Sequence, residues 1–313
     1  MSKILCFGSV NIDTIYFLPG QLVIGETVSS SRQFIGAGGK GANQCAALAK
    51  AGAAVYMSGK IGKDGTWIKE KLSLLGANTD LLLESETEST GRTVIMNSIS
   101  SRENTVVFYP GTNYDLTKED IEQTFNHFHR GDWLLLQDEV NLGNEIIILG
   151  KKKGMTIVFN PAPINREITQ LYPFNLVDIL ILNEIEARGL YFEITKEELG
   201  SLSYGTLIEI CHNRYPNLRG IVITLGSDGV IADFKMPPYG TSQMFAIPAI
   251  KTDVIDTTAA GDTFIGFFVA ALIKSGMRDI EEALIQGVKA ASITVSREGA
   301  MDTIPKLEEL KKE

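Results

Sequence analysis

The sequence is poor in cysteine, histidine and tryptophan, and each scarcity narrows the possible functions. The 313 residues include three cysteines, three histidines and two tryptophans. Cys6, Cys45 and Cys211 form no CxxC pair, and their odd number and wide spacing predict free thiols in a reducing compartment. The chain also has no histidine and cysteine spacing that is typical of a zinc site.

Long apolar runs and basic blocks are missing as well. No apolar run approaches the roughly 20 residues of a membrane span, and the one after the N-terminus is too short for a signal peptide. We therefore expect a cytoplasmic protein with no membrane partner. The formal net charge of −9, with no basic block, argues against nucleic acid as a partner. An anionic ligand would need local backbone N–H groups, a helix N-terminus or a metal.

Apolar runs of strand length alternate with amphipathic stretches of helix length. The expected strands are KILCFGSV, AVYMSGKIG, DWLLLQ, MTIVFN, VDILILN and RGIVITLG. Several are continuously apolar, as buried parallel strands are. The expected helices span residues 40–51, 65–75, 117–128, 141–153, 203–213, 261–275 and 279–297. This alternation predicts one α/β domain over residues 1–313, with a mainly parallel sheet covered on both faces by helices.

Two segments depart from this alternation of strands and helices, and they predict a small β structure. Residues 12–35 alternate like strands, and residues 91–109 indicate a hairpin with its turn near 101–104. We expect a flap formed by about 12–37 and 91–110, which would serve as a lid if it lies beside a pocket. An ordinary β extension packed on the body fits the pattern equally well.

The stretch GAGGKGANQ, residues 36–44, raises four possibilities. It matches G-x-G-x-x-G at Gly36, Gly38 and Gly41, but it does not follow the first strand directly, as a dinucleotide fingerprint should. It fails the Walker pattern because Gly41 follows Lys40 where Ser or Thr is required. The remaining possibilities are a grip for a polyhydroxylated ligand at the mouth of a helix, or a glycine-rich turn with a solvated lysine.

A second cluster, DTTAAGDTFIG over residues 256–266, opens a helix that is apolar on nearly every side. Ala259, Ala260 and Gly261 are small, so backbone N–H groups can approach an anion where the helix dipole favours negative charge. Asp262 follows them and could accept a proton from a hydroxyl. The alternative, that Asp262 only caps the helix, leaves the small residues before it unexplained.

Further polar residues follow the other predicted strands, at the sheet edge where open α/β folds bind ligands. Each of them alone could be a turn or cap residue, but together they mark one edge. They are Asn11, Asp13, Glu139, Asn183, Glu186 and residues 224–229.

Taken in order, these motifs resemble the ribokinase-like (PfkB) family of carbohydrate kinases. The resemblance runs through GSVNID, GGKGANQ, LLLQDE, NPAP, NEIEA, ITLGSDG, DTTAAGDTF and VSREGA, and the pair GGKGAN with DTTAAGDTF is highly specific. It implies a three-layer α/β/α sandwich with a β lid. It also implies transfer of the γ-phosphoryl of ATP to a sugar hydroxyl with Mg²⁺, with the 5-hydroxyl of D-ribose as first choice. Another sugar or a nucleoside is the alternative.

The resemblance also implies roles for individual residues. The sugar ligands would be Asn11, Asp13, Gly39, Lys40, Gly41, Ala42, Asn43, Glu139 and Asp262. Asp262 would be the catalytic base, with Ala260 and Gly261 as the anion hole. The nucleotide would contact Asn183, Glu186, Thr224, Leu225, Gly226, Ser227, Asp228, Gly229 and Gly261. An activating K⁺ would be held by Asp256, Thr258, Thr294, Arg297, Gly299 and Thr303.

Two positions depart from the family pattern, and some properties stay open. Asp138 stands where the family often has leucine, and Val288 stands where it usually has asparagine near the adenine. The exact substrate, the purine preference, the oligomeric state and the extent of lid motion are therefore not predicted. A homodimer formed through the β lid is implied by analogy with the family.

Overall fold

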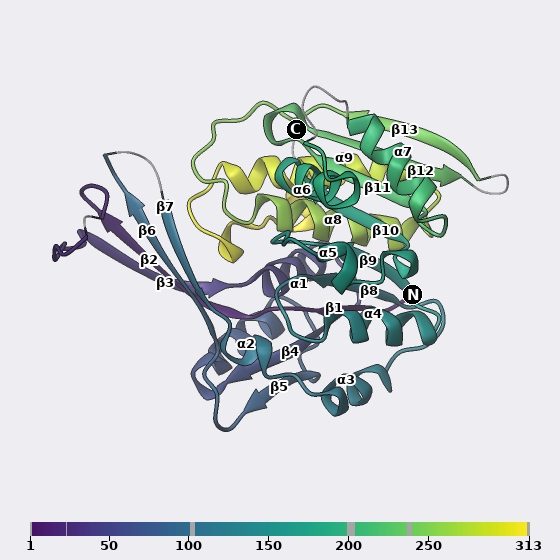
Figure 1. Cartoon of the computed structure of the whole chain (residues 1–313). Helices are drawn as coiled ribbons and strands as arrows, with labels where there is room; N and C mark the ends of the chain where they lie inside the picture. Colours follow the sequence, from purple (N-terminus) through teal and green to yellow (C-terminus); the bar gives the residue numbers. More distant parts are fainter. Residues whose placement is uncertain (1, 23, 101–103, 199–203, 237–239, 312–313) are drawn as a thin grey trace.

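Two β-sheets of unequal size organise the chain (Figure 1). The computed structural model describes residues 2–22, 24–100, 104–198, 204–236 and 240–311. The large sheet has nine strands in the order β13-β12-β11-β10-β9-β8-β1-β4-β5. Its strands are β1 (Ile4–Phe7), β4 (Val55–Gly62), β5 (Leu82–Ser85), β8 (Trp133–Gln137), β9 (Thr156–Asn160), β10 (Ile179–Asn183), β11 (Gly220–Thr224), β12 (Val230–Met236) and β13 (Thr241–Ile247).

The large sheet is parallel except at one edge. The strands β5, β4, β1, β8, β9, β10 and β11, in this spatial order, pair in parallel with their neighbours. Strand β12 pairs antiparallel with β11, and β13 pairs antiparallel with β12. The six predicted strands are all in the parallel part, which confirms the expected sheet. We did not predict β5, β12 or β13. Strand β13 is an exposed edge strand, so the burial that marks the inner strands is missing there.

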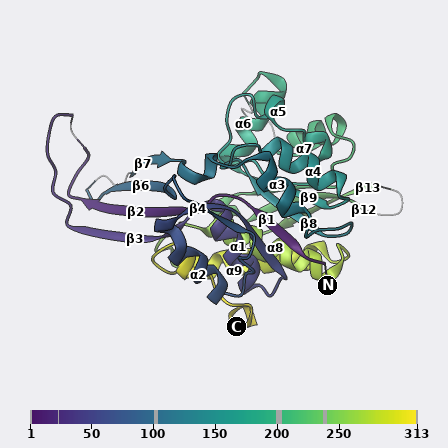
Figure 2. The same ribbon diagram turned by 90° about the horizontal axis from the view of Figure 1, so that it is seen from below.

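Helices cover both faces of this sheet, as Figure 2 shows in a view from below. One face carries α1 (Lys40–Lys50), α2 (Thr66–Leu74), α8 (Ala260–Ser275) and α9 (Ile280–Val295). The other carries α3 (Lys118–Phe125), α4 (Gly143–Lys152), α5 (Ile168–Leu171), α6 (Glu184–Thr195) and α7 (Tyr204–Arg214). Strand β1 sends Ile4 and Cys6 into one core and Leu5 and Phe7 into the other. The predicted three-layer α/β/α sandwich is confirmed.

The small sheet projects from the body (Figure 1). It contains the two segments, 12–35 and 91–109, that did not fit the alternation of strands and helices. Its order is β3-β2-β6-β7, formed by β2 (Asn11–Leu18), β3 (Arg32–Gly38), β6 (Gly91–Ser98) and β7 (Asn104–Tyr109). Strands β2 and β3, and β6 and β7, are antiparallel hairpin partners, while β2 and β6 pair in parallel. Of the turn predicted near 101–104, residues 101–103 lie outside the described residues, and Asn104 begins β7.

The predicted helices are also present, with ends within three residues of those expected. We predicted neither α5 nor α6, although Asn183 and Glu186 were singled out. The sequence of α6, EIEARGLYFEIT, places a glycine and several β-branched and aromatic residues inside the helix, which weakens its local helical signal. Among the described residues, no helix has both the length and the apolar character needed to span a membrane.

Candidate active site

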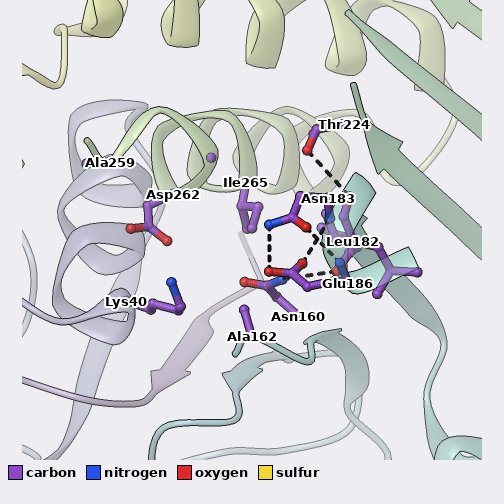
Figure 3. A pocket seen from close by; sticks show the side chains of 12 residues that line it. Lys40, Asn160, Ala162, Leu182, Asn183, Glu186, Thr224, Ala259, Asp262 and Ile265 are labelled. Atoms are coloured by element: carbon purple, nitrogen blue, oxygen red, sulfur yellow. Dashed lines mark hydrogen bonds between the residues drawn. The ribbon is translucent and has the colours of Figure 1, made fainter. Parts of the chain in front are cut away.

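The candidate site lies at the carboxyl ends of the parallel strands. A cavity of about 200 Å³ opens there, between the first turns of α1, α6 and α8 and the ends of β9, β10 and β11 (Figure 3). Because neighbouring parallel strands end at the same edge, residues distant in sequence meet in this cavity. Its lining residues are Lys40, Asn160, Ala162, Ile181, Leu182, Asn183, Glu186, Thr224, Ala259, Gly261, Asp262 and Ile265.

The glycines of GAGGKGANQ allow α1 to begin against the loop that follows β1. Gly39 has φ of 89°, a left-handed conformation that favours glycine. A Cβ on Gly41 would lie 2.5 Å from backbone atoms of Gly8 and Ser9, so only glycine allows this close approach. The motif therefore sets the position of Lys40 and the rest of the first turn.

Asp262 lies in the first turn of α8 and faces the start of α1. It accepts a hydrogen bond from Asn43 Nδ2 at 3.2 Å and another from Gln44 Nε2 at 2.9 Å. Burial raises the pKa of Asp262, and the nearby Lys40 ammonium opposes this shift. Figure 3 shows the Lys40 amine and the Asp262 carboxylate both directed into the cavity.

The N-terminus of α8 approaches the cavity without a capping side chain. Ala259, its N-cap, has φ of 60° and makes no side-chain capping bond. Gly261 lines the cavity, whereas the Ala260 N–H donates to the carbonyl of Thr257 at 3.2 Å. Of the two amides predicted as an anion hole, that of Ala260 thus already has an acceptor.

Three polar side chains meet on the opposite wall. Asn183 caps α6 in a reciprocal arrangement with Glu186: Glu186 N–H donates to Asn183 Oδ1 at 2.8 Å, and Asn183 N–H donates to Glu186 Oε2 at 2.9 Å. Asn160 at the end of β9 donates to Glu186 Oε2 at 3.2 Å. Burial raises the pKa of Glu186, so this carboxylate is poorly solvated.

The predicted sugar residues lie on the side toward the small sheet. Glu139 accepts hydrogen bonds from Lys40 N at 3.0 Å and from the Ser9 hydroxyl at 2.5 Å. Asn11 is buried and accepts a hydrogen bond from Asn113 Nδ2 at 2.7 Å. The other predicted contacts of this group, Gly39, Gly41 and Ala42, surround Lys40 at the start of α1.

Asp13 is the most strongly perturbed residue of this group. Burial, together with the nearby carboxylates of Glu139 and Asp262, raises its pKa to about 7, although a hydrogen bond from Thr93 opposes the shift. Its Oδ1 is buried and has no partner among the described residues, and the same holds for Asn43 Oδ1. A ligand hydroxyl would supply the missing donor at both atoms.

The predicted nucleotide loop is only partly at the cavity. Thr224 lines it and donates from Oγ1 to the Leu182 carbonyl at 3.4 Å. The loop then closes on itself, because Leu225 N–H donates to the Gly229 carbonyl at 2.8 Å and Gly229 has φ of 96°. The residues between them are exposed: Gly226, Ser227 and Asp228.

The two halves of the predicted K⁺ site do come together. Asp256 Oδ2 accepts from Gly299 N at 3.1 Å, and its Oδ1 accepts from the Thr258 amide and hydroxyl at 2.9 and 2.6 Å. Arg297 Nη1, however, donates to the Thr303 carbonyl at 3.1 Å, so a side-chain cation already contacts one predicted ligand. The Thr294 hydroxyl is buried and donates to Thr263 Oγ1 at 3.1 Å.

Sequence reasoning missed several polar residues of this region. Ser9 contacts Glu139, Asn113 contacts Asn11, Asn160 contacts Glu186, and Gln44 contacts Asp262. Asn160 and Gln44 lie within the quoted motifs NPAP and GGKGANQ, so their polarity in otherwise apolar surroundings was an available signal. Ser9 also lies within a quoted motif, GSVNID, whereas Asn113 belongs to none of them.

Known proteins resemble this chain over nearly its whole length. A family model described as pfkB family carbohydrate kinase matches residues 1–307. Ribokinase of Staphylococcus aureus (strain COL) is 33% identical over 99% of this chain and 98% of its own length. Deoxyribokinase of Salmonella typhi is 30% identical over 98% of this chain and 96% of its own. The crystal structure of ribokinase from Cryptococcus neoformans var. grubii serotype A in complex with ADP has a TM-score of 0.85 and 35% identity, and covers 99% of both chains.

Proposed function

The chain belongs to the pfkB family of carbohydrate kinases and is an ATP-dependent carbohydrate kinase, and from this premise we propose that it phosphorylates the 5-hydroxyl of D-ribose. One observation carries the assignment of the reacting group. Asp262 is a carboxylate with a raised pKa that shares one cavity with Lys40, Glu186, Thr224 and the start of α8.

In the proposed reaction, Asp262 accepts the proton of the sugar hydroxyl while the hydroxyl oxygen attacks the γ-phosphorus of ATP. The bond between that phosphorus and the β–γ bridging oxygen breaks, and ADP leaves with the electron pair. A desolvated carboxylate is a stronger base than one in water, and this suits a general base for a hydroxyl. The Asn43 and Gln44 amides hold Asp262 in place for the transfer.

Charge stabilisation comes from two sources on this chain. The Lys40 ammonium is directed into the cavity, and the first turn of α8 directs its positive dipole end there (Figure 3). We expect Gly261 N–H to donate to the transferring phosphoryl group. Such donors, fixed before the reaction starts, reduce the reorganisation needed as charge develops.

Magnesium would enter with ATP, and the polar residues on the β9 and β10 side suit it. Mg²⁺ usually takes one or two carboxylates, with water and phosphate as its other ligands. Glu186 is a buried carboxylate with Asn183 and Asn160 beside it, so this donor set fits such an ion directly or through water. Bound there, the ion would neutralise phosphate charge.

The proposed base is tested by Asp262→Asn, which keeps the shape but removes proton acceptance. We expect turnover in a coupled ADP-release assay with ribose to fall by about 10²- to 10⁴-fold, the usual contribution of a general base. Sugar affinity should change little. Asp302→Asn is the matched control, because Asp302 forms an exposed ion pair with Lys71. Near-normal turnover of Asp262→Asn would contradict the assignment.

Substrate choice has a specific rival, because a deoxyribokinase is among the relatives at 30% identity. The same assay across pentoses, hexoses and nucleosides separates the candidates. A site tuned to ribose should lose about 1–3 kcal/mol of transition-state binding with 2-deoxyribose, because a buried polar group is then left unpaired. Equal kcat/KM for the two sugars would argue for a broader pentose kinase, and preference for a nucleoside would argue for the related nucleoside activity.

The small sheet supports two further proposals. It adjoins the sugar side through Asn11 and Asp13, so we expect residues 12–37 and 91–110 to close over the bound sugar. Its strands also expose large apolar side chains, among them Ile35, Val106, Val107 and Phe108, which fits a homodimer formed through this sheet. A monomer in sedimentation velocity at micromolar concentration would contradict the dimer.

The cytoplasm is the proposed location, because Cys6, Cys45 and Cys211 are all free and buried. Free thiols suit a reducing compartment. Fractionation of the source cells with an antibody to this chain tests the proposal, and recovery outside the cytoplasm would contradict it.

A further inference from the structure

Gln44 is fully buried on α1 and connects the candidate base to two other elements. Its Nε2 donates to Asp262 Oδ1 at 2.9 Å and to Asn160 Oδ1 at 3.1 Å. Its Oε1 accepts from Gln137 Nε2, at the end of β8, at 2.7 Å. All three polar positions of this side chain are thus used, and the side chain itself is inaccessible to solvent.

A backbone carbonyl sets the direction of these hydrogen bonds. The carbonyl of Ile181 can only accept, so Asn160 must turn its NH₂ group toward it, and the two lie 3.1 Å apart. The Asn160 oxygen then faces Gln44, which must present its own NH₂ group in return. That leaves the Gln44 oxygen for the NH₂ group of Gln137.

This direction determines what Asp262 meets. With the Gln44 amide turned the other way, its oxygen would face the Asp262 carboxylate, and two acceptors would be in contact without a proton. The chain of amides therefore presents a donor to Asp262, and a donor stabilises the ionised form that can accept a proton. Consistent with this, the hydrogen bond from Gln44 lowers the pKa of Asp262, against the effect of burial.

We propose that Gln44 is a positioning residue that keeps Asp262 ionised and oriented, and that links it through Asn160 to Glu186 on the nucleotide side. The inference rests on the proposed role of Asp262 as the base. It assigns a function to the last residue of GAGGKGANQ, which contacts no solvent. The competing view is that Gln44 only joins α1 to β8 and β9 as part of the core.

Other charges also act on Asp262, and a pH experiment must keep them unchanged. They lie on α1, after β8, on α6 and on β2, and they are Lys40, Glu139, Glu186 and Asp13. Replacing Gln44 by an uncharged residue of similar length leaves all four in place. A change in the pH profile would then report the lost amide.

The test is the pH dependence of kcat for Gln44→Met in the full-length enzyme. Activity of the wild type should fall on the acid side as Asp262 becomes protonated in the substrate complex. Loss of the Gln44 donor should raise the pKa of Asp262 and move this acid limb upward by about one pH unit. Thr124→Val is the control, because it removes a buried hydrogen bond to Ser58 away from the cavity and should leave the limb unmoved.

Gln44→Met leaves Gln137 with a buried unpaired NH₂ group, which can impair folding. The double variant with Gln137→Met removes that group, and the upward shift should persist. If neither folds, Gln137→Met alone should give a smaller upward shift, because the Gln44 amide loses its anchor. An acid limb that does not move in any folded variant would overturn the proposal.

Failure of this inference can be told apart from failure of the proposed function. If Asp262→Asn is inactive but the acid limb of the Gln44 variant is unmoved, Asp262 remains the base and Gln44 belongs to the core only. If Asp262→Asn retains normal turnover, the proposed base is wrong, and the role of Gln44 falls with it.

Discussion

The sugar side of the candidate site and the predicted cation loops differ in how the hydrogen bonds of their polar groups are completed. Four buried side-chain atoms lack a partner in the described part of the chain, and two of them belong to Asp13 and Asn43, on the sugar side. At the predicted cation loops, both carboxylate oxygens of Asp256 and the Thr303 carbonyl already accept hydrogen bonds from the protein.

The difference indicates that the sugar side needs a ligand to complete its hydrogen bonds, whereas the cation loops are already stabilised by hydrogen bonds within the protein. An unpaired polar atom in a buried position costs about 1–3 kcal/mol, so a cluster of them is retained where a ligand completes the bonds. A cluster that satisfies itself needs no ligand in order to be stable. We therefore expect substitutions on the sugar side to act on binding first, and changes at the cation loops to act on rate through the α8 N-terminus.

Within this comparison, the largest effect is expected from Asp13→Asn on the sugar side. The variant keeps the shape of the side chain but replaces one acceptor oxygen by a donor and removes the charge. At pH 8, above the pKa of Asp13, we expect kcat/KM for ribose to fall by about 10- to 100-fold, the value of a hydrogen bond to a charged group, while KM for ATP changes little. The coupled assay with Asp302→Asn as control measures this, and an unchanged kcat/KM would remove Asp13 from the sugar site.

A moderate effect is expected at the cation loops. Turnover in potassium chloride should exceed turnover in tetramethylammonium chloride by about tenfold, at equal ionic strength and fixed magnesium, because a cation beside the loop of residues 256–259 would fix the donors at the start of α8. Asp256→Asn should abolish the difference. Equal rates in the two salts, with no potassium-dependent change in thermal stability, would mean that the Arg297 contact replaces the ion rather than accompanying it.

The smallest effect is expected on the stability of the free protein. Asp13 has a pKa of about 7 in the folded state, against 3.8 for a solvated aspartate side chain, so the folded state holds its proton to higher pH than the unfolded state does. Stability from this group is therefore present at low pH and is lost as pH rises toward 7. Lys40, Glu139 and Asp262 are the charged groups that face it.

Asp13→Asn removes this dependence and should raise the melting temperature by a few °C at pH 8, even though it impairs binding. The gap to wild type should widen from pH 5 to pH 7 and then level off in differential scanning calorimetry. A constant gap across this range would mean that Asp13 is ionised throughout. Burial of Asp13 would then carry little cost for its charge, and the contrast between the sugar side and the cation loops would be weaker.

Much of the fold was predictable because its signals are local. Buried parallel strands read as continuous apolar runs, and the six predicted runs all became neighbours in the large sheet. The positions of the site at the strand ends and at the starts of α1 and α8 were predictable for the same reason. Strand β13 and helix α6 were missed because exposure or mixed composition removed the periodic signal.

What the sequence determined by itself was the layered α/β architecture and the two motifs at the N-termini of α1 and α8. Only the tertiary structure decided which side chains of these motifs meet. Gly266 allows close packing of α8 on α1, where a Cβ would lie 2.3 Å from that of Ala47, and this brings Gln44 to Asp262 across 218 positions of sequence. Periodicity records only neighbours along the chain. Hydrogen-bond direction and the protonation of Asp13 depend on contacts made across the fold, which no local pattern contains.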